Sequence, residues 1–120
     1  MAFYSKFKNK RTERAGYSFS SGLEAATFSI LKLQEAAGEI EILKVQDRVL
    51  LTNAKIAYIA DFKCRDKITN EEFWVESKGF QTPEWRIKKR LWEHYGPGKL
   101  IIYTGTKYNP VLSETIIPKL

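Results

Sequence analysis

Glu76 and Lys78 lie two residues apart in the segment 73–78, whose aromatic and β-branched residues predict a β-strand. Side chains alternate across a strand, so both project from the same face. The carboxylate can bind a hard divalent cation, and the ammonium can orient a water molecule beside it. The same spacing is also typical of a plain surface ion pair, so these two residues alone do not identify an active site.

Asp61 closes the apolar segment Ile56–Ala60, where an acid is out of character unless it has a partner or a chemical role. The charged segment 65–72 predicts a turn that joins this strand to the strand of Glu76 as an antiparallel hairpin. Two carboxylates that meet in this way repel each other, and a bound Mg²⁺ relieves the repulsion. The alternative is that Asp61 marks the solvent end of its strand.

Asp61, a hairpin and then Glu76-Ser77-Lys78 resemble the signature of the PD-(D/E)xK nuclease superfamily. The segments 19–24 and 74–79 are similar to those of phage Holliday-junction resolvases of the endonuclease I type. The segment 58–62 together with 82–84 resembles small phage-encoded proteins assigned to the same superfamily. The resemblance spans residues 19–103, and it departs from the signature at Ala60, where the superfamily has a proline.

The resemblance implies a metal site. Asp61, Glu76 and the backbone carbonyl of Ser77 would bind Mg²⁺, with Mn²⁺ as a substitute, and Lys78 would orient or activate the attacking water. Glu24 matches an acid on the first helix that assists metal binding. Residues 21–24 also have the pattern of a capping box, in which Glu24 reaches back to the Ser21 backbone N–H. The sequence leaves both roles of Glu24 open.

The implied function is a metal-dependent endonuclease that hydrolyses phosphodiester bonds of DNA. Branched DNA is the expected substrate, as for a phage-encoded Holliday-junction resolvase acting in DNA recombination, and a homodimer is implied. Nucleases that cut DNA ends, flaps or specific sites remain alternatives, as does a nucleic-acid-binding module without catalysis. A pure binder has no use for two acids facing a phosphate, so the acidic pair favours chemistry.

The chain must build a scaffold that brings these residues together. Apolar residues at spacings of three and four predict a helix from Ser21 that Gly38 ends. Three strands follow between Glu39 and Lys78, then a helix from Thr82 to Tyr95, a strand at 100–103 and an irregular tail with Pro110 and Pro118. The fold class is α/β (α+β), with a restriction-endonuclease-like core, a mixed sheet flanked by helices and the order α-β-β-β-α-β.

The formal net charge of +6 over 120 residues is compatible with a polyanionic partner, but a basic surface that serves only solubility is an equally ordinary explanation. We expect residues 1–16 to form a basic flexible arm and residues 17–120 to form a single domain, a nuclease domain if the resemblance holds. The arm's aromatic residues suit either stacking on bases or docking on the domain. The expected DNA contacts are, in the arm, Lys6, Lys8, Lys10, Arg11 and Arg14 and, after the catalytic lysine, Gln81, Arg86, Lys89 and Arg90.

The remaining residues with chemical potential have structural interpretations. Trp85 and Trp92 are expected to pack in the core rather than stack on bases. The single cysteine, Cys64, cannot form an internal disulfide, and neither it nor His94 has a catalytic partner in sequence context. No segment approaches membrane-spanning length, so we expect a soluble cytoplasmic protein, in the host cytoplasm if phage-encoded.

Overall fold

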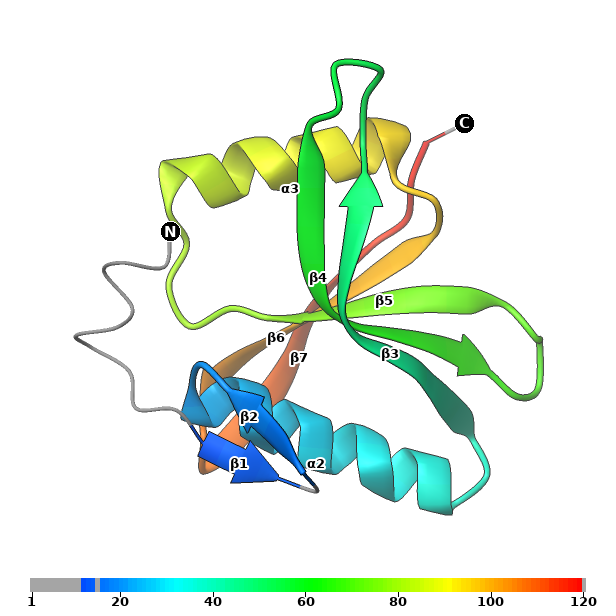
Figure 1. The fold of residues 1–120 in the computed structure, drawn as a ribbon, viewed down its shortest axis with the longest axis vertical. Helices are drawn as coiled ribbons and strands as arrows, with labels where there is room; N and C mark the ends of the chain where they lie inside the picture. The colour runs from blue at the N-terminus through cyan, green and yellow to red at the C-terminus, as the bar shows by residue number, and fades with distance from the viewer. Residues whose placement is uncertain (1–11, 15, 120) are drawn as a thin grey trace.

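The computed structural model describes residues 12–14 and 16–119. Figure 1 shows a twisted sheet with one helix on each side and a small two-stranded hairpin at the N-terminal end. In chain order the elements are β1 (Thr12–Arg14), β2 (Tyr17–Phe19), α2 (Gly22–Ala36), β3 (Ile40–Leu50), β4 (Ala57–Asp66), β5 (Glu72–Ser77), α3 (Pro83–Tyr95), β6 (Lys99–Thr106) and β7 (Asn109–Ile116).

The main sheet has five strands in the order β3-β4-β5-β6-β7. The pair β5–β6 is parallel, and the other neighbouring pairs are antiparallel. The parallel pair requires a crossover, and α3 supplies it. The structure is therefore an α+β fold with a mixed sheet flanked by two helices, consistent with the expected restriction-endonuclease-like core.

Both helices begin and end at the residues that the sequence indicates. Ser21 caps α2, and its hydroxyl accepts a hydrogen bond from the Glu24 backbone N–H. After α2, Gly38 adopts a φ of +81°, a conformation that glycine reaches without steric cost. Thr82 caps α3 through the backbone N–H of Trp85, and Pro83 occupies the first turn, where a missing N–H costs nothing.

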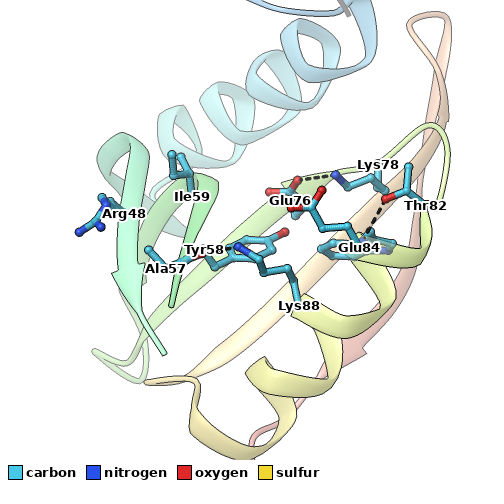
Figure 2. A pocket seen from close by; sticks show the side chains of 10 residues that line it. Arg48, Ala57, Tyr58, Ile59, Glu76, Lys78, Thr82, Glu84 and Lys88 are labelled. Atoms are coloured by element: carbon cyan, nitrogen blue, oxygen red, sulfur yellow. Dashed lines mark hydrogen bonds and ion pairs between the residues drawn. The ribbon is translucent and has the colours of Figure 1, made fainter. Parts of the chain in front are cut away.

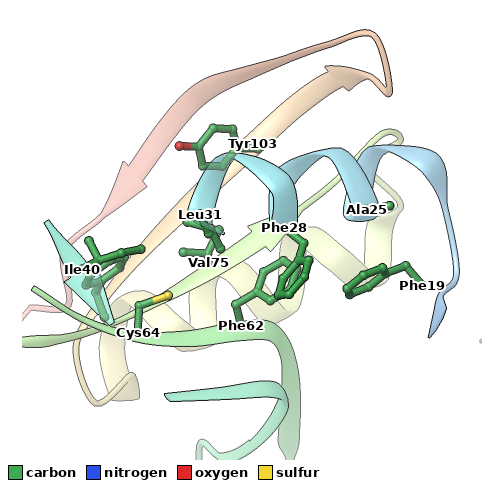
Figure 3. Close-up of a cluster of buried hydrophobic side chains, with 10 residues drawn as sticks. Phe19, Ala25, Phe28, Leu31, Ile40, Phe62, Cys64, Val75 and Tyr103 are labelled. Atoms are coloured by element: carbon green, nitrogen blue, oxygen red, sulfur yellow. The ribbon is translucent and has the colours of Figure 1, made fainter. Parts of the chain in front are cut away.

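Two separate hydrophobic clusters fix the helices to opposite faces of the sheet. The first lies under α2 and contains Phe28 and Leu31 from the helix and Phe62 and Val75 from the sheet (Figure 3). The Phe28 and Phe62 rings stack with their centroids 5.7 Å apart. The second lies under α3 and is mainly aromatic, built from Tyr58, Trp74, Trp85 and Trp92 together with aliphatic residues of β6 and β7.

Strand β4 changes faces at Asp61. Tyr58 and Ala60 belong to the cluster under α3, whereas Phe62 and Cys64 belong to the cluster under α2. In a regular strand these four alternate residues would share one face. The strand is therefore sharply twisted between Ala60 and Phe62, and Asp61 lies at the point where it passes from one layer to the other.

Two sequence expectations were wrong. The tail is not irregular, because Asn109–Ile116 forms the edge strand β7; Pro110 is tolerated there because an edge strand leaves one side of its backbone unpaired. The expected arm is also not wholly separate from the domain, because Thr12–Arg14 pairs with Tyr17–Phe19 as a hairpin. Residues 1–11, with most of the arm's basic residues, lie outside the described part of the chain. Within residues 12–14 and 16–119, no helix is both long and apolar enough to span a membrane.

Phe62→Ala tests how far the first cluster supports the strand that carries Asp61. Phe62 is fully buried, so the free energy of unfolding should fall by about 3 to 5 kcal/mol, measured by urea denaturation. Leu33→Ala on α2 is the matched control, because this side chain is 72% exposed and its loss should change stability by less than about 0.5 kcal/mol. Equal losses in the two variants would contradict the proposed core.

Candidate active site

Asp61, Glu76 and Ser77 meet where strands β4 and β5 diverge. The β4–β5 ladder runs from Arg65–Glu72 to Phe62–Val75, beyond which β4 pairs only with β3. At the fork, the Asp61 backbone N–H donates to Glu76 Oε1 at 3.2 Å. The Ser77 backbone N–H and hydroxyl both donate to Asp61 Oδ2, at 2.8 and 2.7 Å. The prediction that a hairpin places the two acidic residues side by side on adjacent strands is confirmed.

Glu76 and Lys78 do project from the same face of β5, as their spacing predicts. Lys78 Nζ lies 3.4 Å from Glu76 Oε2 and 4.8 Å from the centroid of the Trp85 ring. The Glu76 side chain is 7% exposed and that of Lys78 is 28% exposed. The carboxylate is therefore held inside the protein, while the lysine reaches it along the face of an aromatic ring.

Glu24 faces the same site from α2. Its Oε1 accepts hydrogen bonds from the Ser20 backbone N–H and hydroxyl, at 3.1 and 2.9 Å. The capping interpretation is thus half right, since Ser21 does cap the helix but the Glu24 carboxylate bonds to Ser20 rather than to the Ser21 N–H. The other oxygen, Oε2, accepts from Gln46 Nε2 at 2.6 Å. Gln46 Nε2 also lies 3.4 Å from Asp61 Oδ1, so it links the helix acid to the sheet acid.

The surroundings of Asp61 and Glu76 favour the protonated forms of these two carboxyl groups. Burial raises the pKa of Glu76 to about 7, although the charge of Lys78 opposes the shift. Asp61 keeps some exposed surface as a residue, but its carboxyl group is enclosed by protein. Burial, then the charges of Glu76 and Glu24, raise the pKa of Asp61 well above its ordinary value. A cation bound among these groups would reverse this preference.

An open pocket of about 370 Å³ lies beside Glu76, between the β3–β4 hairpin and α3. Figure 2 shows the ion pair of Glu76 and Lys78 at one side of it, with Tyr58 and Lys88 nearby. Basic side chains in its lining are Arg48, Lys78 and Lys88, and Glu84 is an acid at the start of α3. The Lys88 ammonium donates to the Ala57 carbonyl at 2.6 Å, which joins α3 to the end of the hairpin.

Trp85 Nε1, a buried polar atom of the pocket, has no hydrogen-bond partner among the described residues. The Tyr58 hydroxyl has none of regular geometry there, but it lies near enough to Glu76 to interact with its carboxylate. Burial, then the charge of Glu76, raises the pKa of the phenol. An unpaired buried polar group costs roughly 1 to 3 kcal/mol, which a bound water or a ligand group can offset.

The donor set fits a hard divalent cation, because Glu24, Asp61 and Glu76 all offer carboxylate oxygens and Mg²⁺ prefers oxygen ligands. As the side chains stand, no three acidic, histidine or cysteine residues of the described chain are close enough to share an ion. Ser77 contacts Asp61 through its N–H and hydroxyl, and its expected role through the carbonyl stays a prediction. Glu24 does not make the capping-box bond to the Ser21 N–H, because its carboxylate accepts from Ser20 and Gln46, and its expected role as a metal ligand stays a prediction.

The predicted DNA-contacting residues of α3 do not line the pocket. Lys89 forms an ion pair with Glu114 of β7 at 3.0 Å, and Arg86 and Arg90 lie with Ile87 and Leu91 around a second hollow. Gln81 is half-buried in the loop before α3. Of the predicted arm contacts, Lys6, Lys8, Lys10 and Arg11 lie outside the described residues, and only the backbone of Arg14 is described, in β1. DNA contact by all of these stays a prediction.

Trp85, Trp92 and Cys64, which were expected to be structural, lie buried in the core. Trp85 and Trp92 are buried in the second cluster, and Trp92 Nε1 donates to the Gly98 carbonyl at 2.8 Å. Cys64 is fully buried in the first cluster, and burial raises the pKa of its thiol to about 12, which makes it a poor nucleophile. His94 is exposed in the last turn of α3.

Sequence reasoning missed Gln46, Tyr58 and Lys88. Lys88 follows Glu84 by one helical turn, so it shares the pocket-lining side of α3, and this spacing could have indicated it. Tyr58 lies in an apolar segment that gives no sign of a role at the site. Gln46 carried no signal at all, because its approach to Glu24 and Asp61 depends on how three distant segments pack.

Glu76→Gln tests the buried carboxyl through the pH dependence of stability in EDTA. The pKa of Glu76 is raised on folding from its ordinary 4.5 to about 7. The contribution of Glu76 to the free energy of unfolding is therefore fully present below pH 4.5 and is lost as the pH rises through 7. The free energy of unfolding of the variant, measured by urea denaturation, should therefore exceed that of the wild type by roughly 2 to 3 kcal/mol at pH 8 and by little at pH 4.5.

Glu71→Gln, in the exposed turn between β4 and β5, is the control and should track the wild type at both pH values. A Glu76→Gln effect of equal size at both pH values would mean that the substitution acts through packing rather than through ionisation.

Comparison with known families gives one match. No curated protein and no solved structure matches the chain. Residues 4–110, which include all of β1 to β6 and the whole candidate site, match the family DUF1064, described as a protein of unknown function. Since the match covers most of the 120 residues, the chain belongs to the DUF1064 family.

Proposed function

We propose that this protein is a metal-dependent endonuclease that hydrolyses phosphodiester bonds of DNA. The observation that carries the proposal is the pair of enclosed acids, Asp61 and Glu76, in the fork between β4 and β5 with Lys78 beside them. Burying two neighbouring carboxyl groups is unfavourable, and a protein keeps such an arrangement where it serves chemistry. The resemblance of these residues and their strands to the PD-(D/E)xK signature supports the same conclusion.

In this mechanism Asp61 and Glu76 would hold Mg²⁺, with Glu24 and the Ser77 carbonyl as further ligands. Bound Mg²⁺ supplies positive charge that offsets the charge building on the scissile phosphate. Ser77 fixes the orientation of Asp61 through two hydrogen bonds to one oxygen. Lys78, supported by the Trp85 ring and by Glu76, directs its ammonium at the attacking water and at the phosphate oxygens. No covalent intermediate is required.

The pocket beside Glu76 suits a nucleic-acid backbone. Arg48 and Lys88 lie along it on either side, from β3 and from α3, and the chain as a whole is basic. Contacts of this kind bind phosphates and carry little sequence information. By resemblance we infer that the substrate is branched DNA, that the enzyme acts as a homodimer in the cytoplasm, and that it is encoded by a phage and serves DNA recombination.

Cleavage of DNA in Mg²⁺ tests the proposal. Asp61→Ala, Glu76→Ala and Lys78→Ala should each lower the rate by at least about 100-fold, because each removes a group that acts on the reacting phosphate or water. Gel assays on a four-way junction, a linear duplex and a supercoiled plasmid measure both the rate and the preference. Glu71→Ala, an exposed acid in the β4–β5 turn, should cut like the wild type.

Cleavage that survives Glu76→Ala and Lys78→Ala, or that needs no divalent metal, contradicts this site. Preferential cutting of the plasmid would agree with the endonuclease activity but contradict the proposed preference for branched DNA. Binding of DNA without cleavage by the wild type would favour a non-catalytic nucleic-acid-binding module.

Deletion of residues 1–11 tests the basic arm and leaves the β1–β2 hairpin whole. The segment carries Lys6, Lys8, Lys10 and Arg11. Each phosphate contact contributes about 0.9 to the slope of log affinity against log salt, so the slope should become shallower by up to about 3 to 4. Fluorescence anisotropy with Ca²⁺ in place of Mg²⁺ measures it, and an unchanged slope would remove the arm from the DNA interface.

A further inference from the structure

Gln46 has a strained backbone inside a strand. Its φ is +61°, in the left-handed region that side-chain-bearing residues seldom adopt. The other described residues of this kind apart from glycine, Lys55 and Asn70, lie in the loops that join β3 to β4 and β4 to β5. Gln46 instead lies in mid-strand, flanked by the pairs Val45–Phe62 and Asp47–Ala60 and therefore opposite Asp61. Strain in such a place is characteristic of functional sites.

The strained backbone directs the amide of Gln46 between two carboxylates. Nε2 lies 2.6 Å from Glu24 Oε2 and 3.4 Å from Asp61 Oδ1. Serines hold the other oxygen of each acid, since Ser20 donates to Glu24 Oε1 and Ser77 donates to Asp61 Oδ2. The two oxygens that no serine holds therefore turn toward a single point, and a nitrogen that bears partial positive charge is at that point.

We propose that Gln46 is a positioning residue that occupies, in the metal-free protein, the place between Glu24 and Asp61 that a divalent cation takes in the active one. The inference rests on the proposed metal-dependent function. An amide N–H group cannot ligate a cation, so in this proposal the Gln46 side chain leaves the place between the two acids when the ion binds and does not turn its carbonyl oxygen to the ion. Gln46 is an exposed residue, which leaves room for that movement.

This role predicts the direction in which removal of the Gln46 amide changes the stability of the metal-free protein and its affinity for metal. In the metal-free protein the amide donates to both acids and lessens their mutual repulsion, so it stabilises that state. It makes no such contact once the ion has replaced it. Removing the amide should therefore destabilise the metal-free protein and strengthen metal binding, whereas a residue that merely supports the site would weaken binding when removed.

Titration of the full chain with Ca²⁺ and with Mn²⁺, followed by calorimetry and by thermal unfolding, tests the proposal. Gln46→Ala should have a lower Tm without metal and bind both ions about tenfold more tightly, the worth of one hydrogen bond to a charged group. Gln46→Lys places a permanent ammonium between the acids, so it should raise the metal-free Tm and abolish ion binding. Gln34→Ala, on α2, is the control and should match the wild type in both measurements.

Equal or weaker ion binding by Gln46→Ala overturns the proposal, and so does ion binding by Gln46→Lys at the wild-type affinity. The second variant keeps the test decisive if the first does not fold. A wild-type protein that binds neither ion contradicts the proposed metal site itself. A wild type that binds both ions, with Gln46→Ala weakened, removes only the role of Gln46.

Discussion

The fork between β4 and β5 is the constraint on which the rest of the site depends. Once the ladder ends at Phe62–Val75, the backbone groups of the separating strands need other partners. Side chains of the opposite strand supply them, since Glu76 accepts from the Asp61 N–H and Asp61 accepts from the Ser77 N–H. The acids are thus part of the connection between the strands, which fixes their positions more firmly than solvent-exposed rotamers would.

That arrangement has a cost that the two cores offset. Burial raises the pKa of both Asp61 and Glu76, so ionising them works against the stability of the fold. Large buried aromatic clusters lie on both sides of the fork, with stacked Phe28 and Phe62 under α2 and packed Trp85 and Trp92 under α3. One cluster holds the part of β4 after Asp61 against α2, and the other holds the part before Asp61 against α3. In the nuclease that we propose, such a site would exchange local stability for preorganised chemistry.

Face-changing in β4 also explains how residues from both layers reach one point. Glu24 comes from α2 on one side of the sheet, whereas Lys78 rests on Trp85 of α3 on the other. β4 twists at Asp61, and the backbone of β3 is strained at Gln46 opposite it. Because β4 and β5 also separate there, side chains from both faces of the sheet can reach the same point. The amide of Gln46 and the carboxyl of Asp61 occupy that opening, between the helix acid and the strand that carries Glu76 and Lys78.

The sequence by itself determined the local features. Helix caps at Ser21 and Thr82, the Gly38 stop, the hairpin joining Asp61 to Glu76 and the shared face of Glu76 and Lys78 all follow from short-range backbone geometry, and the structure confirms them. Tertiary structure alone decided that 109–116 pairs as an edge strand, that Lys88 rather than Lys89 lines the pocket, and that Gln46 lies between Glu24 and Asp61. These features depend on the twist of β4 and on the packing of segments distant in the chain, and no local pattern encodes either.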